Sequence, residues 1–114
     1  MSASKRVAVL GELMDCYNKQ DVDGYAAFFT DDGCEAAYRG AVLRDGRDGI
    51  RDGYAKVFAE FPENRAEVTG MTEFADQIVV QEKVARSSTA EPFDVPAIYS
   101  FTSDDKIARV EFIR

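Results

Sequence analysis

The spacing of large apolar residues changes from a helical period to a strand period along the chain, and this change does most to limit the fold. Residues 5–20 and 46–61 repeat apolar side chains every three or four positions, which predicts two amphipathic helices. Residues 22–29 predict a short helix between them, with Asp21 as its N-cap and Asp31-Asp32-Gly33 as the break after it. The first half of the chain is therefore expected to hold three helices.

The second half of the chain alternates apolar and polar residues, which is the period of a β-strand. Four long strands are predicted, at residues 67–74, 77–86, 95–102 and 106–114. A shorter strand is expected at 34–39, a hairpin or loop at 40–46, and a turn or loop at 87–94. Helices followed by an antiparallel meander indicate the α+β class.

The length and charge of the chain restrict the number of domains and the class of partner. Its 114 residues fit one domain, residues 1–114, with a single core. The formal net charge is −7 and basic residues do not cluster, which argues against nucleic acid and anionic membranes as partners. No stretch has the character of a signal peptide or a membrane span, so a cytoplasmic protein is expected.

The chain contains no histidine, which removes the usual general base near neutral pH and a common ligand of transition metals. Catalytic triads that need an imidazole are therefore excluded. Cys16 and Cys34 have no CxxC spacing, and we interpret them as reduced, partly buried thiols. No metal site is predicted, and any chemistry is expected to need no cofactor.

Glu82 is the first candidate for a catalytic residue. In its predicted strand it shares a face with Ile78, Val80 and Val84, so its carboxylate stands in an apolar row. Burial raises the pKa of a carboxyl group and produces a side chain able to transfer protons near neutral pH. The structural alternative is that Glu82 pairs with an arginine, such as Arg109, or reaches water at a sheet edge.

Tyr99 and Glu35 are the other candidate catalytic residues. Tyr99 shares a strand face with Phe101, and its phenol could hold a carbonyl or enolate oxygen, or could be a core tyrosine bonded to a backbone carbonyl. Glu35 and Tyr38 point to opposite faces of their short strand, so at most one of them lines a pocket on the helix side. The strand register decides which one, and the sequence leaves it open.

Aromatic residues on apolar faces supply candidate ligand contacts. Tyr17, Tyr25 and Tyr54 lie on the apolar stripes of the three predicted helices, where tyrosines are more often core residues than ligand contacts. The candidates retained for ligand binding are Tyr17, Tyr38, Tyr54, Phe58 and Phe101.

Several local sequences, taken in order, carry a resemblance to a known superfamily. They are YNKQDVDGYAAFFTDD (17–32), GRDGI (46–50), FP (61–62), AIYSF (97–101) and DKIARVEF (105–112). Together they resemble the nuclear transport factor two-like superfamily, and within it the SnoaL-like proteins related to ketosteroid isomerase. The resemblance covers nearly the whole chain.

This resemblance implies a strongly curved antiparallel sheet wrapped around three helices and enclosing a conical pocket, in a cystatin-like architecture, usually within a homodimer. It does not fix the reaction, because the fold serves isomerases, cyclases, dehydratases, epoxide hydrolases and binding proteins. Where ketosteroid isomerase has its three functional groups, this chain has Leu13, Ala37 and Ala97, so that mechanism is not expected. The SnoaL-like relatives resemble this chain at two positions: they have a glutamate at the place of Glu82 and a tyrosine near the place of Tyr38.

Two functional hypotheses follow. In the first, the pocket binds a small hydrophobic or carbonyl-containing molecule, and Glu82 or Glu35 moves a proton while Tyr99 or Tyr38 stabilises the oxygen, as in an isomerisation or dehydration. In the second, the chain is a non-catalytic module that binds an apolar ligand or uses its sheet to bind a partner. A ligand-sized pocket around an unpaired Glu82 would favour the enzyme.

Overall fold

Three helices and six strands follow one another in the computed structural model, which describes residues 4–113. The helices are α1 (Lys5–Asn18), α2 (Val22–Ala26) and α3 (Gly46–Glu60). The strands are β1 (Phe29–Ala37), β2 (Val42–Asp45), β3 (Arg65–Phe74), β4 (Gln77–Ala85), β5 (Phe93–Phe101) and β6 (Ile107–Phe112). The α+β class and the order of helices before a meander are thus confirmed.

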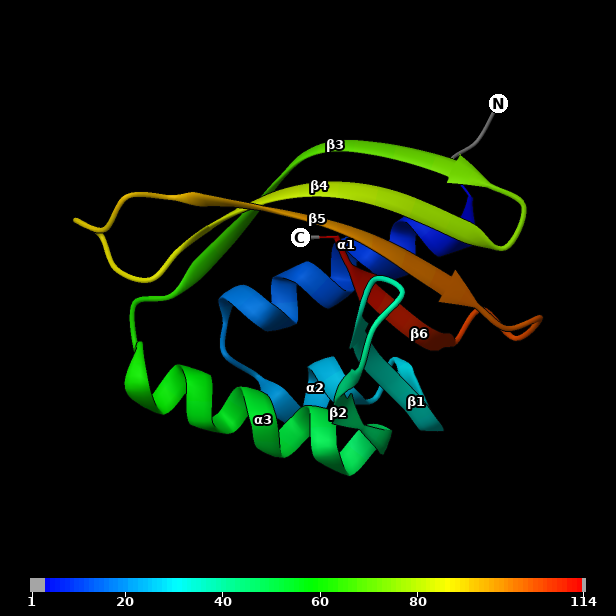
Figure 1. Ribbon diagram of the computed structural model, residues 1–114, viewed down its shortest axis with the longest axis horizontal. Coiled ribbons are helices and arrows are strands. Elements are labelled where there is room, and N and C mark those ends of the chain that lie inside the picture. The colour runs from blue at the N-terminus through cyan, green and yellow to red at the C-terminus, as the bar shows by residue number, and fades with distance from the viewer. Residues whose placement is uncertain (1–3, 114) are drawn as a thin grey trace.

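All six strands join one sheet in the order β2-β1-β6-β5-β4-β3. Neighbours are antiparallel except β1 and β6, which run parallel, so the expectation of a purely antiparallel sheet is wrong at this pairing. The parallel pairing arises because the meander β3–β6 brings its last strand beside the first one, after the chain has crossed over through α3. In Figure 1, β3, β4 and β5 arch over α1, and α3 lies beyond α1.

Irregular pairings accompany the curvature of the sheet. The register between β3 and β4 shifts between Val68 and Gly70, and that between β5 and β6 shifts between Ser100 and Phe101. An extra residue on one strand of an antiparallel pair bends that strand and increases its twist. The arch of the long strands in Figure 1 gives the sheet a concave face, on which α1 packs.

The predicted second helix is too long and the predicted first strand too short. Asp21 caps α2 as expected, accepting a hydrogen bond from the Gly24 backbone N–H at 3.0 Å. The helix ends at Ala26, however, and Phe29 already belongs to β1 because it pairs with β6. The Asp31-Asp32-Gly33 segment expected to be a turn lies within β1, where the register with β6 shifts. Pairing to a distant strand overrides this local turn signal.

Side chains tie the start of α1 to the turn between β5 and β6 and its end to β3. Near its start, Arg6 Nε donates to Asp105 Oδ1 at 2.9 Å and Nη2 donates to the Thr102 carbonyl at 3.0 Å. At its end, Asn18 donates to the Ala66 carbonyl at 3.0 Å and accepts from the Ala66 N–H at 2.8 Å. These bonds fix α1 against the concave face of the sheet, where its apolar side chains join the core. Among residues 4–113, no helix combines the length and the hydrophobicity that a bilayer crossing requires.

Candidate functional site

A cavity of about 120 Å³ lies between the helices and the inner face of the sheet. Cavities of this order hold one small ring, since an engineered apolar cavity of about 150 Å³ binds benzene. Apolar side chains make up half of its wall, and several tyrosines and charged groups complete it. The polar lining residues are Tyr17, Tyr25, Arg44, Tyr54, Glu82, Arg86 and Tyr99.

Glu82 enters this wall from β4. The face predicted for it is confirmed, because Ile78, Val80 and Val84 are buried with it and the residues between them are more exposed. Its partner across the ladder is Val68, directly beside the irregular pairing in β3. Only 6% of Glu82 is exposed to solvent. The strand thus holds one carboxyl group at the concave face.

The environment of Glu82 favours its protonated form. Burial, with a smaller contribution from the negative charge of Glu35, raises the pKa of Glu82 to about 7, while interaction with the Tyr99 hydroxyl acts in the opposite direction. Among the described residues, no lysine or arginine lies within ion-pair distance of Glu82. Arg109, the partner considered in the structural alternative, is 3.7 Å from Glu111 instead. Glu82 can therefore gain or lose a proton near neutral pH.

Tyr99 lines the same cavity from β5. It is buried together with Ala97 and Phe101, which confirms the predicted inner face of this strand. Burial, followed by the negative charge of Glu82, raises the pKa of Tyr99 well above its ordinary value. Its phenol therefore stays protonated at neutral pH and can donate a hydrogen bond.

Glu35 is the centre of a second polar group, directly behind the cavity wall. Its carboxylate is completely buried, and Oε2 accepts hydrogen bonds from Tyr25 at 3.0 Å and from Tyr54 at 2.9 Å. Oε1 accepts from Arg44 Nη1 at 3.0 Å. Burial raises the pKa of Glu35, and the charge of Arg44 opposes that rise. Tyr25, Tyr54 and Arg44 all line the cavity while Glu35 does not, so Glu35 fixes wall residues without touching the space.

The helix tyrosines form one aromatic cluster. The Tyr17 ring centre lies 5.7 Å from that of Tyr54 and 5.2 Å from that of Phe58. The Tyr17 hydroxyl accepts a 2.7 Å hydrogen bond from Asn64 Nδ2. Tyr17 and Tyr54 reach the cavity, whereas Phe58 packs behind them in the core.

Besides Phe58, two more of the predicted ligand contacts lie away from the cavity. The register left open by the sequence places Glu35 inside and Tyr38 outside, where Tyr38 is 42% exposed just beyond the end of β1. Phe101 is buried at the far end of β5, and the Arg6 guanidinium carbon stands 5.7 Å from its ring centre. Neither residue is part of the cavity wall.

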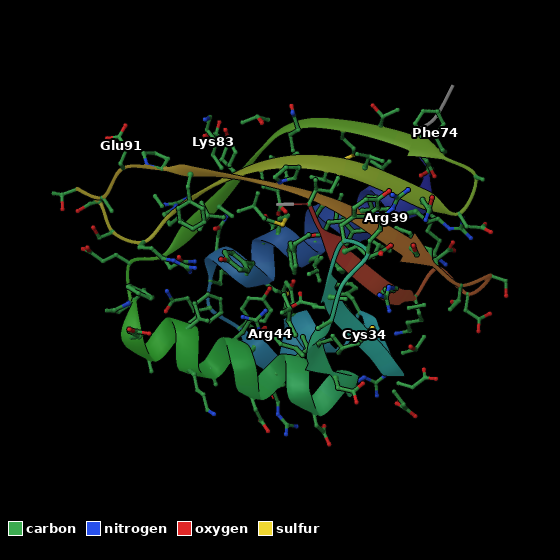
Figure 2. All side chains as sticks on the ribbon, viewed as in Figure 1. Cys34, Arg39, Arg44, Phe74, Lys83 and Glu91 are labelled. Carbon is green, nitrogen blue, oxygen red and sulfur yellow. The ribbon has the colours of Figure 1, made fainter. Side chains whose placement is uncertain are left out.

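Sequence reasoning missed the arginines of the wall, Arg44 and Arg86. The signal for Arg44 was the hairpin at 40–46, because β1 and β2 pair Glu35 with Arg44 directly across the ladder. The signal for Arg86 was the alternation in β4, which continues one step beyond Glu82 and Val84. Figure 2 shows Arg44 turned toward the helices, whereas Lys83 projects from the outer side of β4.

The sequence matches one family model over most of its length. Residues 10–110 match the SnoaL-like domain family. Among proteins with curated descriptions, none matches the chain.

Solved structures similar to the chain share its fold. An uncharacterised cystatin-fold protein from Novosphingobium aromaticivorans is 42% identical, with a TM-score of 0.89 over 98% of this chain and 100% of that one. A candidate polyketide cyclase from Sinorhizobium meliloti is 21% identical, with a TM-score of 0.77 over 92% of this chain and 93% of that one. An NTF2-like protein of unknown function from Cytophaga hutchinsonii is 10% identical, with a TM-score of 0.77 over 97% and 90% of the two chains.

Proposed function

The chain belongs to the SnoaL-like domain family, and from that premise we propose that its cavity binds a small apolar carbonyl compound and that Glu82 transfers a proton on it, as in a cofactor-independent isomerase or lyase. One observation carries the proposal. Glu82 is a buried carboxyl group that lines a cavity and has a pKa of about 7, and no cation among residues 4–113 neutralises it. A group with this pKa supplies both proton acceptor and donor at neutral pH.

The proposed step begins with Glu82 ionised. Its carboxylate removes a proton from a carbon next to the ligand carbonyl, and the electron pair of that C–H bond moves to the carbonyl oxygen to give an enolate. Tyr99 donates a hydrogen bond to this oxygen and remains protonated, because its own pKa is well above neutral pH. Where the carbonyl compound carries a β,γ double bond, the charge of the enolate extends to the γ-carbon, and Glu82 completes an isomerisation by returning the proton there. No atom is oxidised or reduced.

The Glu35 group supports this chemistry from behind the wall. It orients Tyr25, Tyr54 and Arg44 through hydrogen bonds, and its negative charge contributes to the raised pKa of Glu82. Glu35 is therefore assigned a positioning role. The similarity in fold to a candidate polyketide cyclase adds support, because an aldol cyclisation also starts with removal of a proton next to a carbonyl.

The proposal is tested by deuterium exchange into cyclohexanone, a one-ring ketone, followed by NMR in D₂O across neutral pD. The wild type should exchange the hydrogens next to the carbonyl faster than buffer, with a rate that rises as Glu82 ionises. Glu82→Gln should fall to the buffer rate, whereas Lys83→Gln, on the outer side of the same strand, should match the wild type. Equal exchange by wild type and Glu82→Gln would refute the catalytic role.

The alternative of a non-catalytic binding module predicts a different result. Cyclohexanone would then stabilise the protein against heat in wild type and Glu82→Gln alike, with exchange at the buffer rate in both. The unpaired state of Glu82 in the described chain supports the enzyme over this module.

The homodimer implied by the family resemblance and the cytoplasmic location expected from the sequence stay predictions. A molar mass near twice 12.7 kDa by light scattering would support the homodimer.

A further inference from the structure

Two arginines line the cavity, and their surroundings differ. Arg44 Nη1 lies 3.0 Å from Glu35 Oε1, and its guanidinium carbon is 4.4 Å from the centre of the Tyr54 ring. The positive charge of Arg44 is therefore balanced inside the wall. Arg44 holds the wall together and leaves no net charge for a ligand.

Arg86, directly after β4, is held without a counter-charge. Its guanidinium carbon lies 5.0 Å from the ring centre of Phe61 and 5.2 Å from that of Phe93. Its Nη1 donates a 3.0 Å hydrogen bond to Oδ1 of Asn64, a residue only 1% exposed that is itself bonded to Tyr17. Within the described part of the chain, no carboxylate lies in ion-pair distance of Arg86. Aromatic and amide contacts thus fix this cation while its charge stays uncompensated.

The unused donors of Arg86 suit one kind of ligand group. A guanidinium carries five N–H donors in a planar fork, of which Asn64 takes one. Such a fork matches the two oxygens of a carboxylate and binds them by paired, charge-assisted hydrogen bonds. The chain has a net charge of −7, so it repels anions in general, and attraction of an anion must come from a local site.

We propose that the cavity selects a small monoanionic carboxylic acid, whose carboxylate binds Arg86 and whose apolar body lies along Phe93 and Phe112. All three residues line the cavity, which has room for about one ring. The inference deepens the proposed function and rests on it for one point, namely that the reacting carbonyl of such an acid faces Glu82 and Tyr99. The substrate class is then a keto acid with a one-ring body.

The test compares two probes of equal shape, benzoate and benzamide, by calorimetric titration of the full chain. Benzoate should bind about tenfold more tightly than benzamide, or better, because only its charge recruits the Arg86 fork. Arg86→Gln should abolish this preference, and Arg86→Lys should restore part of it by keeping the charge without the fork. Arg65→Gln, the same change at an exposed arginine outside the cavity, should behave as the wild type.

Other outcomes overturn the inference. Equal affinities of wild type for the two probes contradict it without any variant, as does failure of benzoate to bind at all. A preference that survives in Arg86→Gln assigns anion binding to another group. Glu82→Gln separates the two proposals, since it should lose ketone exchange yet keep the benzoate preference. If Glu82→Gln loses ketone exchange but the wild type does not prefer benzoate to benzamide, the proposed function stands and only the substrate class is refuted.

Discussion

The hydroxyl of Tyr54 donates a 2.9 Å hydrogen bond to Glu35 Oε2, while the ring that carries it forms part of the cavity wall. One tyrosine thereby joins a fully buried carboxylate to the space where a ligand would lie. The same double role belongs to Tyr25 and Arg44. A change in the charge of Glu35 should consequently alter the stability of the protein and the shape of the cavity together.

Arg44→Met should destabilise the fold strongly. It would leave Glu35 buried without its only cationic partner among the described residues, and breaking a buried pair in this way costs about 3 kcal/mol or more. Urea unfolding at pH 7 measures the loss. The double variant Arg44→Met/Glu35→Gln should recover much of it, since the uncompensated charge is gone, whereas additive losses would contradict the assignment of this pair.

Glu82→Gln should be more stable than the wild type at high pH and equal to it at low pH. A carboxyl group with a pKa near 4.3 in the unfolded chain and about 7 in the folded protein favours folding while protonated. The protonated Glu82 therefore contributes its full stability below the pKa of the unfolded chain, and this stability is lost as the pH rises through the pKa of the folded protein. The gap between variant and wild type should open above about pH 4.3 and approach about 4 kcal/mol above pH 8.

The measurement is urea unfolding of both proteins at pH 5 and pH 8.5. The ionisable and charged cavity residues are Tyr17, Tyr25, Arg44, Tyr54, Arg86 and Tyr99, with Glu35 behind the wall, and all are shared by both proteins. A gap that is the same at the two pH values would show that Glu82 titrates normally in the folded state.

Tyr99→Phe should keep the fold and lower the exchange rate. The ring stays in the core between β4 and β6, but the hydroxyl that would face the enolate oxygen is removed. Loss of one such donor reduces kcat by about 100-fold. The measurement is deuterium exchange into cyclohexanone. Tyr38→Phe, which removes an exposed phenol, is the control and should exchange at the wild-type rate. An unchanged rate in Tyr99→Phe would assign the oxygen to another donor.

Asn18→Ala should destabilise the protein by about 2 kcal/mol without affecting the charges of the cavity. The Asn18 side chain satisfies both the N–H and the carbonyl of Ala66, at 2.8 and 3.0 Å, and so joins the end of α1 to β3. Urea unfolding gives the loss. Asn18→Gln, whose amide stands on a longer side chain, should lose nearly as much stability as Asn18→Ala. If Asn18→Ala is as stable as the wild type, water replaces the amide at no cost.

The fold was predictable where the periodicity of the sequence is strong. The alternation around Glu82 gave the correct face of β4, and the apolar stripes gave α1 and α3 within two residues. The error lay at residues 27–33, where Asp31-Asp32-Gly33 signals a turn. Its local preference is overruled by pairing with β6, whose position no nearby residue reveals.

The candidate site was predictable one strand at a time but not across strands. Alternation placed Glu82 and Tyr99 inward on their own strands, and both line the cavity. It could not decide between Glu35 and Tyr38, because a shift of one residue exchanges the two faces. The Glu35–Arg44 pair depends on the register of β1 with β2, which is irregular directly after Glu35.

The parallel contact between β1 and β6 sets an order in which the protein can be assembled. Cys34 and Arg109, which pair across these strands, are 75 residues apart in sequence, whereas β3 and β4 are joined by a tight turn. On the ribosome, the β3–β4 hairpin can therefore form while β1 still lacks a neighbour on one side. Until β6 emerges, Glu35 stays beside an open strand edge, so the wall of the cavity is completed only after the whole β3–β6 meander has been made.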